Sequence, residues 1–551
     1  MPTARFARLT LPVLLSVLTV ARAHGQTPEP APAPAAPAPE PTAPVPAPAA
    51  ATPAIAELPH PIVAEPPHVV ADHSAVDHAD GHHSPWHWRS WLQQRLTMDE
   101  ASVVQSLGPT AGDAGLLRDG TQLESRSRAG TELAYTAKSG FLRKAIAELE
   151  VQVRYWDRPE PPLASDAFAL RQGKLELTTL AGQFTLGRTV SSWGLGLLAQ
   201  DGAYDPLQFG AKRGATTVTR LGYGILPAAI FGSGDPTKAF PLALAVARDW
   251  VAVDDLAQYR GDKAANLVAA LLYRGSSLQT GAYVVRRDQT GDGALALQAT
   301  VIDGFARYKH KRPGGRYVEL AAEALYIMGH TDWLKSPSSP AGLDVAQYGG
   351  VARLETGNAK QALRTEVGLA SADALPLNGT LRSFRFASDY KVGLVLFGQV
   401  QRQLSEQAVR NLSDGRYTNA APAAVDRVAT QGALTQAAYL HQVLRMQASP
   451  HIAVLFGGLV AHSPADVADP FRTFLNGGKA TGPRGAIGKR GLGFELDAGL
   501  EAAAHPAAWL TALARIEGGV WFPGDAFDTA DGQPMAAVGA VQGQIHLRSE
   551  F

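Results

Sequence analysis

Apolar and polar residues alternate along much of the chain from Thr131 to its last residue. The final segment is the clearest case, because Val541, Ile545, Leu547 and Phe551 fall on one face. Gln, His, Arg and Glu at the even positions from 542 to 550 fall on the other face. Successive side chains of a β-strand point to opposite faces, so one face of this strand is apolar and the other is polar. Either an ordinary amphipathic edge strand or a strand of a barrel fits this pattern.

Further segments show the same period over about ten residues, the length that crosses a bilayer at a tilt. They are residues 148–155, a hairpin over 175–186 with its turn at Ala181-Gly182, and residues 318–326, 363–369, 494–501 and 510–520. A soluble chain of this length should divide into domains joined by linkers, and no such break follows Thr131. We therefore predict an all-β fold, a single antiparallel transmembrane β-barrel of about 16–18 strands over residues 131–551, with a disordered N-terminal leader.

The residues before the barrel divide by composition. Residues 1–23 are typical of a signal peptide, because Arg5 and Arg8 precede a short apolar run and Ala21-Arg22-Ala23 forms a cleavage site. Residues 24–57 form a linker rich in Pro and Ala that should be extended and solvated. This linker is either a tether across part of the periplasm or a passive spacer.

Residues 58–90 form a histidine-rich segment. Imidazoles and carboxylates together suit zinc, copper or nickel, although the irregular spacing fits a solvated linker that chelates weakly or not at all. The candidate metal ligands are His73, His78, His82, His83 and His87. Three tryptophans at positions 86, 88 and 91 indicate either an interfacial anchor or a contact at the barrel mouth. Residues 91–130 lack clear periodicity, and we expect a leader that serves as a possible plug.

Composition limits the chemistry. The chain has no cysteine, which excludes disulfides, zinc thiolates and cysteine nucleophiles. It carries 50 basic and 50 acidic residues, of which 8 and 12 precede Thr131, leaving 42 and 38 in the predicted barrel. A conduit for a polyanion needs a strongly cationic lumen, so this small surplus favours a neutral or mixed cargo. Arginines gathered on one wall would reverse that conclusion, and the candidates are Arg188, Arg213, Arg220, Arg274, Arg286, Arg307, Arg364 and Arg445.

One internal motif stands out between Gly187 and Gly202: Gly187-Arg188, then Trp193-Gly194-Leu195-Gly196, then Asp201-Gly202. Together with the terminal strand, it resembles segments of large bacterial outer-membrane β-barrels. These include uncharacterised barrels of gliding, polysaccharide-secreting bacteria and, more loosely, alginate-export-type porins. The resemblance implies that Arg188 and Trp193 lie near the lumen or rim, where Arg213, Arg220 and Arg364 are further candidates. It also implies that Ile545, Leu547 and Phe551 belong to the signal read by the barrel-assembly machinery.

Two classes of function remain open. The first is a porin-like channel in the outer membrane of a Gram-negative bacterium, passing small solutes or a secreted neutral or mixed polysaccharide. The second is a plugged structural or adhesion barrel that acts through surface loops and a periplasmic tether. We expect contact with outer-membrane lipid and periplasmic secretion or envelope partners of the leader. No catalytic motif indicates an enzyme, and the balanced charge without a basic cluster gives no indication of nucleic-acid binding.

The metal hypothesis can be tested on a peptide covering Leu58 to Ser90. If the histidines chelate, calorimetric titration with zinc or copper should release heat at pH 7, and affinity should collapse below about pH 6 as the imidazoles take up protons. The same peptide with its histidines replaced by glutamine is the control. An absence of heat with either metal would end the hypothesis.

Overall fold

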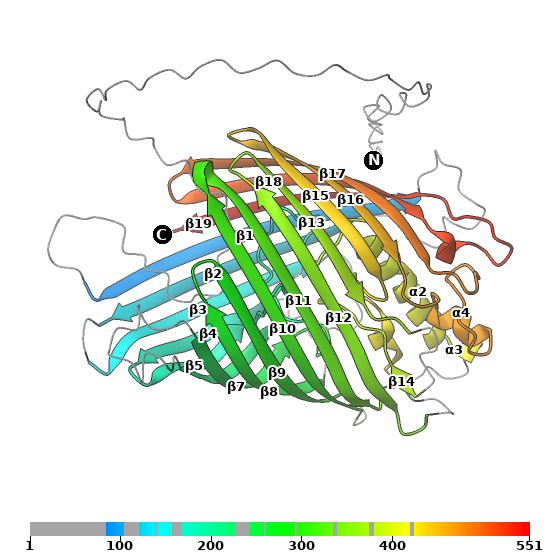
Figure 1. Ribbon diagram of the computed structural model, residues 1–551, viewed down its shortest axis with the longest axis horizontal. Helices are drawn as coiled ribbons and strands as arrows, with labels where there is room; N and C mark the ends of the chain where they lie inside the picture. Colours follow the sequence, from blue (N-terminus) through cyan, green and yellow to red (C-terminus); the bar gives the residue numbers. More distant parts are fainter. Residues whose placement is uncertain are drawn as a thin grey trace, which may run out of the picture. The chain divides into compact units, whose positions relative to one another are not determined.

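A closed ring of β-strands forms the protein (Figure 1). The computed structural model describes residues 84–103, 121–137, 140–156, 168–212, 214–225, 227, 242–257, 261–291, 295–333, 335, 339–373, 379–418 and 424–551. The expected signal peptide, the linker at 24–57 and every candidate metal ligand except His87 lie outside these residues.

Eighteen antiparallel strands make the ring, which confirms the predicted fold class and falls at the upper end of the predicted range. They are β1 (Trp86–Val103), β2 (Gln122–Thr136), β3 (Leu142–Trp156), β4 (Phe168–Thr179), β5 (Gly182–Val190), β6 (Thr217–Ile225), β7 (Leu242–Val253), β8 (Lys263–Arg274), β9 (Leu278–Thr290), β10 (Ala296–Arg312), β11 (Arg316–Thr331), β12 (Leu343–Gly357), β13 (Gln361–Ala370), β15 (Ala438–Ser449), β16 (Ile452–His462), β17 (Gly491–Ala507), β18 (Leu510–Pro523) and β19 (Val538–Glu550). The remaining strand, β14 (Thr380–Leu381), lies in the connection between β13 and β15 and forms a short parallel pairing with β12.

The ring closes where β1 pairs with β19. Their register runs without a break from Trp91 opposite Glu550 to Val103 opposite Val538. Closure leaves no strand edge, so the backbone N–H and C=O groups of the wall bond within the sheet, as a lipid environment requires. The terminal strand is thus the closing strand of a barrel.

The predicted start of the barrel at residue 131 is wrong. Most of β1 and of β2 lies within residues 91–130, which were assigned to a leader or plug. The first residues of β1, among them Trp86, His87 and Trp88, belong to the segment 58–90 that was assigned as histidine-rich. The alternation is weaker here because the polar Gln94 lies on the outer face between Leu92 and Leu96. Its amide nitrogen donates to Ser125 Oγ on β2 at 2.9 Å, so the polar group is satisfied within the wall.

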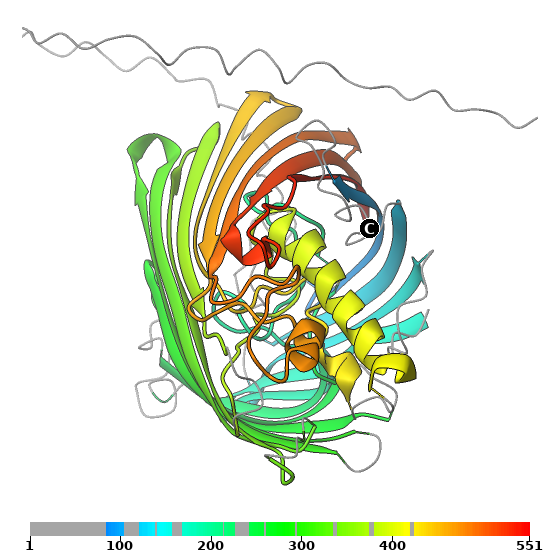
Figure 2. The same ribbon diagram turned by 90° about the vertical axis from the view of Figure 1, so that its right-hand side faces the viewer.

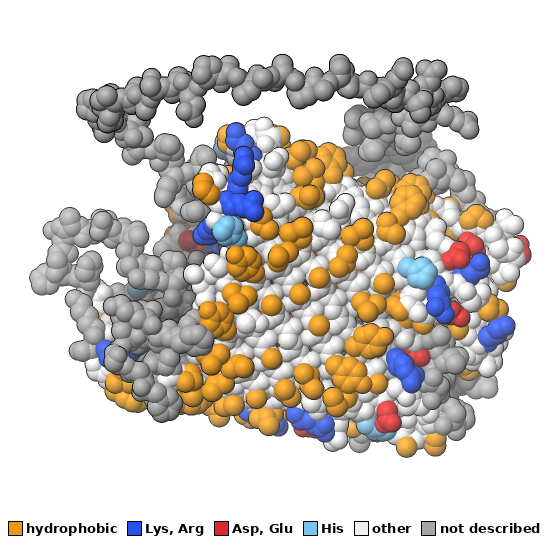
Figure 3. Space-filling view, in the orientation of Figure 1, with side chains coloured by type: hydrophobic (Ala, Val, Ile, Leu, Met, Phe, Trp, Pro, Cys, Tyr) orange, Lys and Arg blue, Asp and Glu red, His pale blue; other side chains and the backbone are white. Residues whose placement is uncertain are grey.

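The outer face of the barrel is apolar, and the inner face carries most of the charged residues of the wall. On β19, Val541, Ile545 and Leu547 are 54%, 47% and 41% exposed, whereas Gln542 and Gln544 are buried inside. Figure 3 shows hydrophobic side chains spread over the strands, with most charged side chains toward the two ends. This arrangement is that of bacterial outer-membrane β-barrels.

The two ends of the barrel differ. Tight turns join β4 to β5, β8 to β9, β12 to β13, β15 to β16 and β17 to β18 at one end, which we call the short-turn end. The other end carries the connections 191–216, 371–437, 463–490 and 524–537, and we call it the loop end. Because long loops face outward in such barrels, the short-turn end corresponds to the periplasmic side.

Helices occur in the connections. They are α2 (Arg402–Ser413), α3 (Gly415–Thr418) and α4 (Pro470–Leu475), with a π-helical turn η5 (Leu396–Gln401) leading into α2 and 3₁₀ turns η4 (Pro313–Gly315), η6 (Val425–Val428) and η7 (Asp525–Phe527). Among the described residues, no helix is both long and apolar enough to cross a membrane.

Removal of Phe551 tests the predicted assembly signal. The Phe551 ring stacks on Trp509 in the β17–β18 turn, with centroids 5.8 Å apart, and its backbone N–H donates to Ser90 O at 2.9 Å. Deletion should reduce the amount of folded, heat-modifiable barrel in the outer membrane while export to the periplasm continues. Phe551→Tyr keeps the aromatic ring and should assemble normally. Normal assembly of the deletion variant would contradict the prediction.

Candidate channel site in the barrel lumen

Inward-folded connections fill one side of the lumen. Figure 2 views the loop end and shows α2 lying across the opening inside the ring of strands. The segment 191–216 also enters the lumen, since Tyr204 Oη hydrogen-bonds Glu501 of β17 and Gly210 N donates to Glu517 of β18 at 3.0 Å. Both connections therefore narrow the pore from within.

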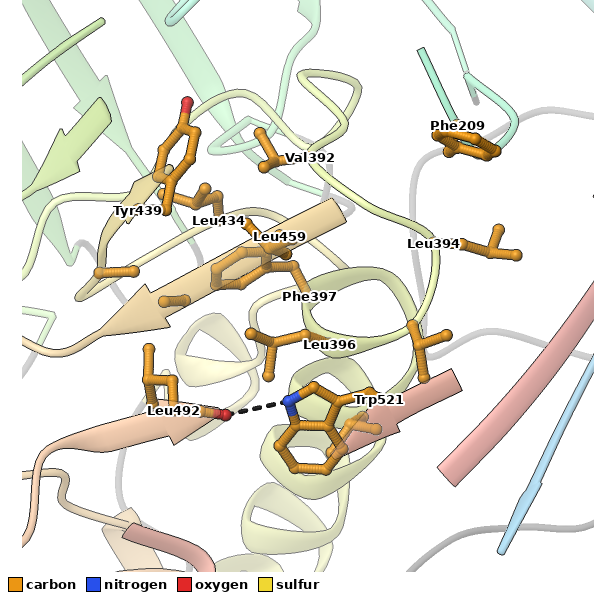
Figure 4. Close-up of a cluster of buried hydrophobic side chains, with 14 of the residues drawn as sticks. Phe209, Val392, Leu394, Leu396, Phe397, Leu434, Tyr439, Leu459, Leu492 and Trp521 are labelled. Carbon is orange, nitrogen blue, oxygen red and sulfur yellow. Dashed lines mark hydrogen bonds between the residues drawn. The ribbon is translucent and has the colours of Figure 1, made fainter. Parts of the chain in front are cut away.

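A hydrophobic cluster forms between these segments and the wall (Figure 4). Phe209, Leu396 and Phe397 come from the inward segments, and Trp521 of β18 packs among them with its indole N–H donating to Leu492 O at 2.9 Å. Glycine on the inner wall permits this close approach. A Cβ on Gly457 would lie 2.6 Å from the Phe209 ring. The filled side therefore has a packed core of its own.

Carboxylates of the wall hold the inward segments through their backbone N–H groups. Glu495 of β17, which is fully buried, accepts from the N–H groups of Leu394, Val395 and Leu396 at 2.5, 2.7 and 2.7 Å. Glu323 of β11 accepts from Leu195 N in the other long segment. Each carboxylate satisfies backbone donors that would otherwise be buried without partners, which costs about 1–3 kcal/mol per group.

An ion pair reinforces this anchoring. Arg364 of β13 donates to Asp205 at 2.7 Å and to Glu355 of β12 at 2.8 Å, so it links the segment 191–216 to the wall. Burial opposes ionisation of Asp205, but the Arg364 guanidinium outweighs burial and holds the pKa of that carboxyl well below its usual range. The pair therefore stays ionised at neutral pH.

A cavity of about 2700 Å³ occupies the other side of the lumen. Its lining includes Thr179 and Gly182 beside the β4–β5 turn at the short-turn end. The lining also includes Phe474 and Gly478 in the connection 463–490 at the loop end. One continuous space therefore extends between the two ends of the barrel.

Most charged groups in the middle of this cavity are paired. Arg220 of β6 makes a two-pronged contact with Asp249 of β7 at 2.8 and 2.7 Å. Arg287 of β9 donates to Asp254 at 2.6 Å. Burial would raise the pKa of Asp254, but Arg287 outweighs burial, so the pKa is lowered and the carboxyl stays ionised. The paired charges neutralise each other and leave little net field in the lumen.

The predicted lumen or rim residues fall in different places. Trp193 and Arg220 line the cavity, whereas Arg364 lies in the filled side. Arg188 follows the exposed Phe184 and Leu186 in alternation, so it lies on the outer face near the loop end, where its Nε donates to Thr219 Oγ1 at 3.1 Å. Arg213 is outside the described residues.

The arginines do not gather on one wall. Arg188 and Arg286 lie on the outer face, Arg220, Arg274 and Arg307 line the cavity, and Arg364 and Arg445 lie in the filled side. Those in the filled side are bound to acidic partners, as in the contact of Arg445 with Glu501 at 2.8 Å. The distribution gives no support to a polyanion conduit.

Trp193 marks the point where a long segment meets the wall beside the cavity. Its ring makes edge contacts with Tyr283 and Phe305, with centroids 4.4 and 5.2 Å apart, and its Nε1 donates to Asp303 at 3.2 Å. The wall carboxylates Asp303, Glu323 and Glu495 were missed in the sequence, because each looks like any other polar residue on an inward face. The glycine-rich segment after Val190 was the available signal for an inserted loop.

No family model matches the sequence, and no curated protein matches it. Among solved structures, the barrel is similar to OccK11 (OpdR) of Pseudomonas aeruginosa, with 10% identity and a TM-score of 0.45 over 84% of this chain and 96% of that one. It is also similar to OccAB4 of Acinetobacter baumannii, with 10% identity and a TM-score of 0.47 over 84% of this chain and 98% of that one. A third similar structure is that of OpdK of P. aeruginosa with vanillate, with 11% identity and a TM-score of 0.45 over 84% of this chain and 98% of that one. Values this low assign neither a family nor a substrate to this chain.

Glu495→Gln tests the anchoring of the segment 371–437. A neutral amide keeps one acceptor and turns two donors toward the three backbone N–H groups, so the attachment should weaken by about 3 kcal/mol. Limited proteolysis should then cut the segment faster than in the parent, while the barrel stays heat-modifiable. Asp531→Asn, at an exposed loop carboxylate, is the control and should leave the cleavage rate unchanged. Equal cleavage rates for parent and Glu495→Gln would refute the anchoring role.

Proposed function

We propose that this barrel is an outer-membrane channel for small solutes. The observation that supports the proposal is the single cavity of about 2700 Å³ whose lining reaches both the short-turn end and the loop end. The inward segments and their anchors set the width of the path on the filled side. The inward segments fill part of the lumen, so a small molecule is a better candidate for the cargo than a secreted polysaccharide.

Because inward segments fill one side of the lumen, the second class of function, a plugged structural or adhesion barrel, is the competing proposal. In that case the segments 191–216 and 371–437 would serve to close the lumen. Their fixed anchors on Glu323, Glu495 and Glu517 fit either a permanent narrowing or a full closure. Ion flow through the refolded barrel distinguishes the two.

Planar-bilayer recording of the refolded barrel provides this test, with the full mature chain and with a form lacking residues 24–83. The truncation must stop before Ser84, because β1 begins at Trp86. Both forms should conduct under the channel proposal. Conductance that appears only after truncation would identify the leader as a plug, and two closed forms would overturn the channel proposal.

A pair of variants on β8 then locates the path. Ala270 lines the cavity and its neighbour Ala269 is exposed on the outer face. Ala270→Trp should reduce single-channel conductance by about half, because the indole occupies the lumen. Ala269→Trp faces lipid, where tryptophan is tolerated, and should leave conductance unchanged. Equal conductance of the two variants would place the ion path elsewhere.

A further inference from the structure

The inner wall beside the cavity is apolar over several adjacent strands. On β7 and β8, the exposed outward residues Leu244, Val246, Leu267 and Leu271 face the lipid side. The residues between them point inward and line the cavity, yet they too are apolar. They include Ala245, Ala247, Val268 and Ala270, and β9 and β10 add Val285 and Val301.

This apolar inner face is a local property of the wall. The lumen of a water-filled barrel is ordinarily polar. In this protein the opposite wall follows that rule, with buried charges such as Glu366, Glu495 and Arg515. Those charges have partners in the inward segments or on neighbouring strands, whereas the apolar wall faces the cavity. Water against such a wall is unfavourable, and an apolar occupant would relieve that cost.

Apolar side chains also contribute to the surface across the cavity. Leu404 and Leu412 of α2 line it, together with Val425 and Phe474 from the loop end. Trp193 and Phe305, which meet edge to face, add aromatic surface. A solute in the cavity is therefore bounded by hydrocarbon and aromatic side chains on two sides.

Charge selection in the middle of the cavity is weak by comparison. Arg220, Arg287 and Arg427 are each held by an aspartate, with Arg427 lying 2.5 Å from Asp262. A passing anion would have to compete with these carboxylates for the guanidinium groups. An uncharged apolar molecule meets no such competition and gains from contact with the wall.

We propose that the channel takes uncharged apolar small molecules, aromatic or aliphatic, and that the inner face of β7 to β10 is its selectivity surface. The inference rests on the proposed channel function and adds the class of solute. It requires the inner apolar face specifically, since the outer face of the same strands is apolar in any membrane barrel.

The test measures uptake of N-phenyl-1-naphthylamine, an uncharged diaryl amine that fluoresces in an apolar environment, by intact cells producing the protein. Uptake should be severalfold faster than in cells without it. Conversion of three inner valines to polar residues, as Val268→Thr, Val285→Thr and Val301→Thr together, should remove most of that gain by loss of apolar contact and bring uptake to within about twofold of cells lacking the protein. These side chains change little in volume.

The matched control changes the outer face of the same sector. Leu267→Thr, Val284→Thr and Ile302→Thr together alter exposed outward residues of β8, β9 and β10 and should keep the fast uptake. Surface amounts of all forms are equalised by their heat-modifiable bands. Equal losses in both triple variants would overturn the proposal, because the inner face would then have no special role.

Conductance separates failure of this inference from failure of the channel proposal. A barrel that conducts ions but speeds uptake of the probe no more than cells lacking it would overturn the solute class and keep the channel. A closed barrel would overturn the channel. In that case, binding of the probe to the refolded barrel is the remaining measurement. If the inner triple variant abolishes this binding and the outer triple variant keeps it, the apolar site is retained as a ligand pocket. The sulfonated analogue 1-anilinonaphthalene-8-sulfonate should be taken up more slowly, and faster uptake of the anion would contradict an uncharged cargo.

Discussion

Backbone hydrogen bonding between β1 and β19 is the constraint on which the rest of the molecule depends. A sheet in lipid cannot leave its N–H and C=O groups unpaired, and only closure removes both edges. The unbroken register of this seam fixes the circumference of the barrel, and the circumference fixes how much space the connections must fill. The packed side of the lumen and the cavity beside it are therefore two consequences of one closed ring.

The two sides of the lumen differ in the kinds of residue that the wall presents to them. Where the inward segments lie, the wall supplies carboxylates such as Glu323 and Glu495 that accept from segment backbone, and Arg364 binds Asp205. Where the cavity lies, the wall supplies alanine and valine, with charges held in internal pairs. The distribution of polar groups around the ring thus decides which part of the lumen is filled by the chain and which part is left for a solute.

Alternation in the sequence predicted the fold class, because a period of two is set by strand geometry alone. It failed for β1, where Gln94 on the outer face is satisfied by Ser125 of the next strand. A pairing across strands leaves no trace in a single segment. The site was harder to predict for the same reason: Glu495 acts on Leu394 to Leu396, about a hundred residues earlier, and nothing near either segment indicates the contact. Trp193 was identified because it lies in a glycine-rich motif, and the resemblance carried by that motif implied a position near the lumen or rim.

The apolar inner face of β7 and β8 has a consequence for the protein before it reaches the membrane. Most strands of a barrel keep one polar face and so retain a side compatible with water while the chain is unfolded. The segments 242–247 and 267–272 are apolar on both faces. Uncharged apolar runs of this kind are prone to associate with other chains. This sector of the wall is therefore one part of the unfolded chain that needs a periplasmic chaperone to keep it from aggregating.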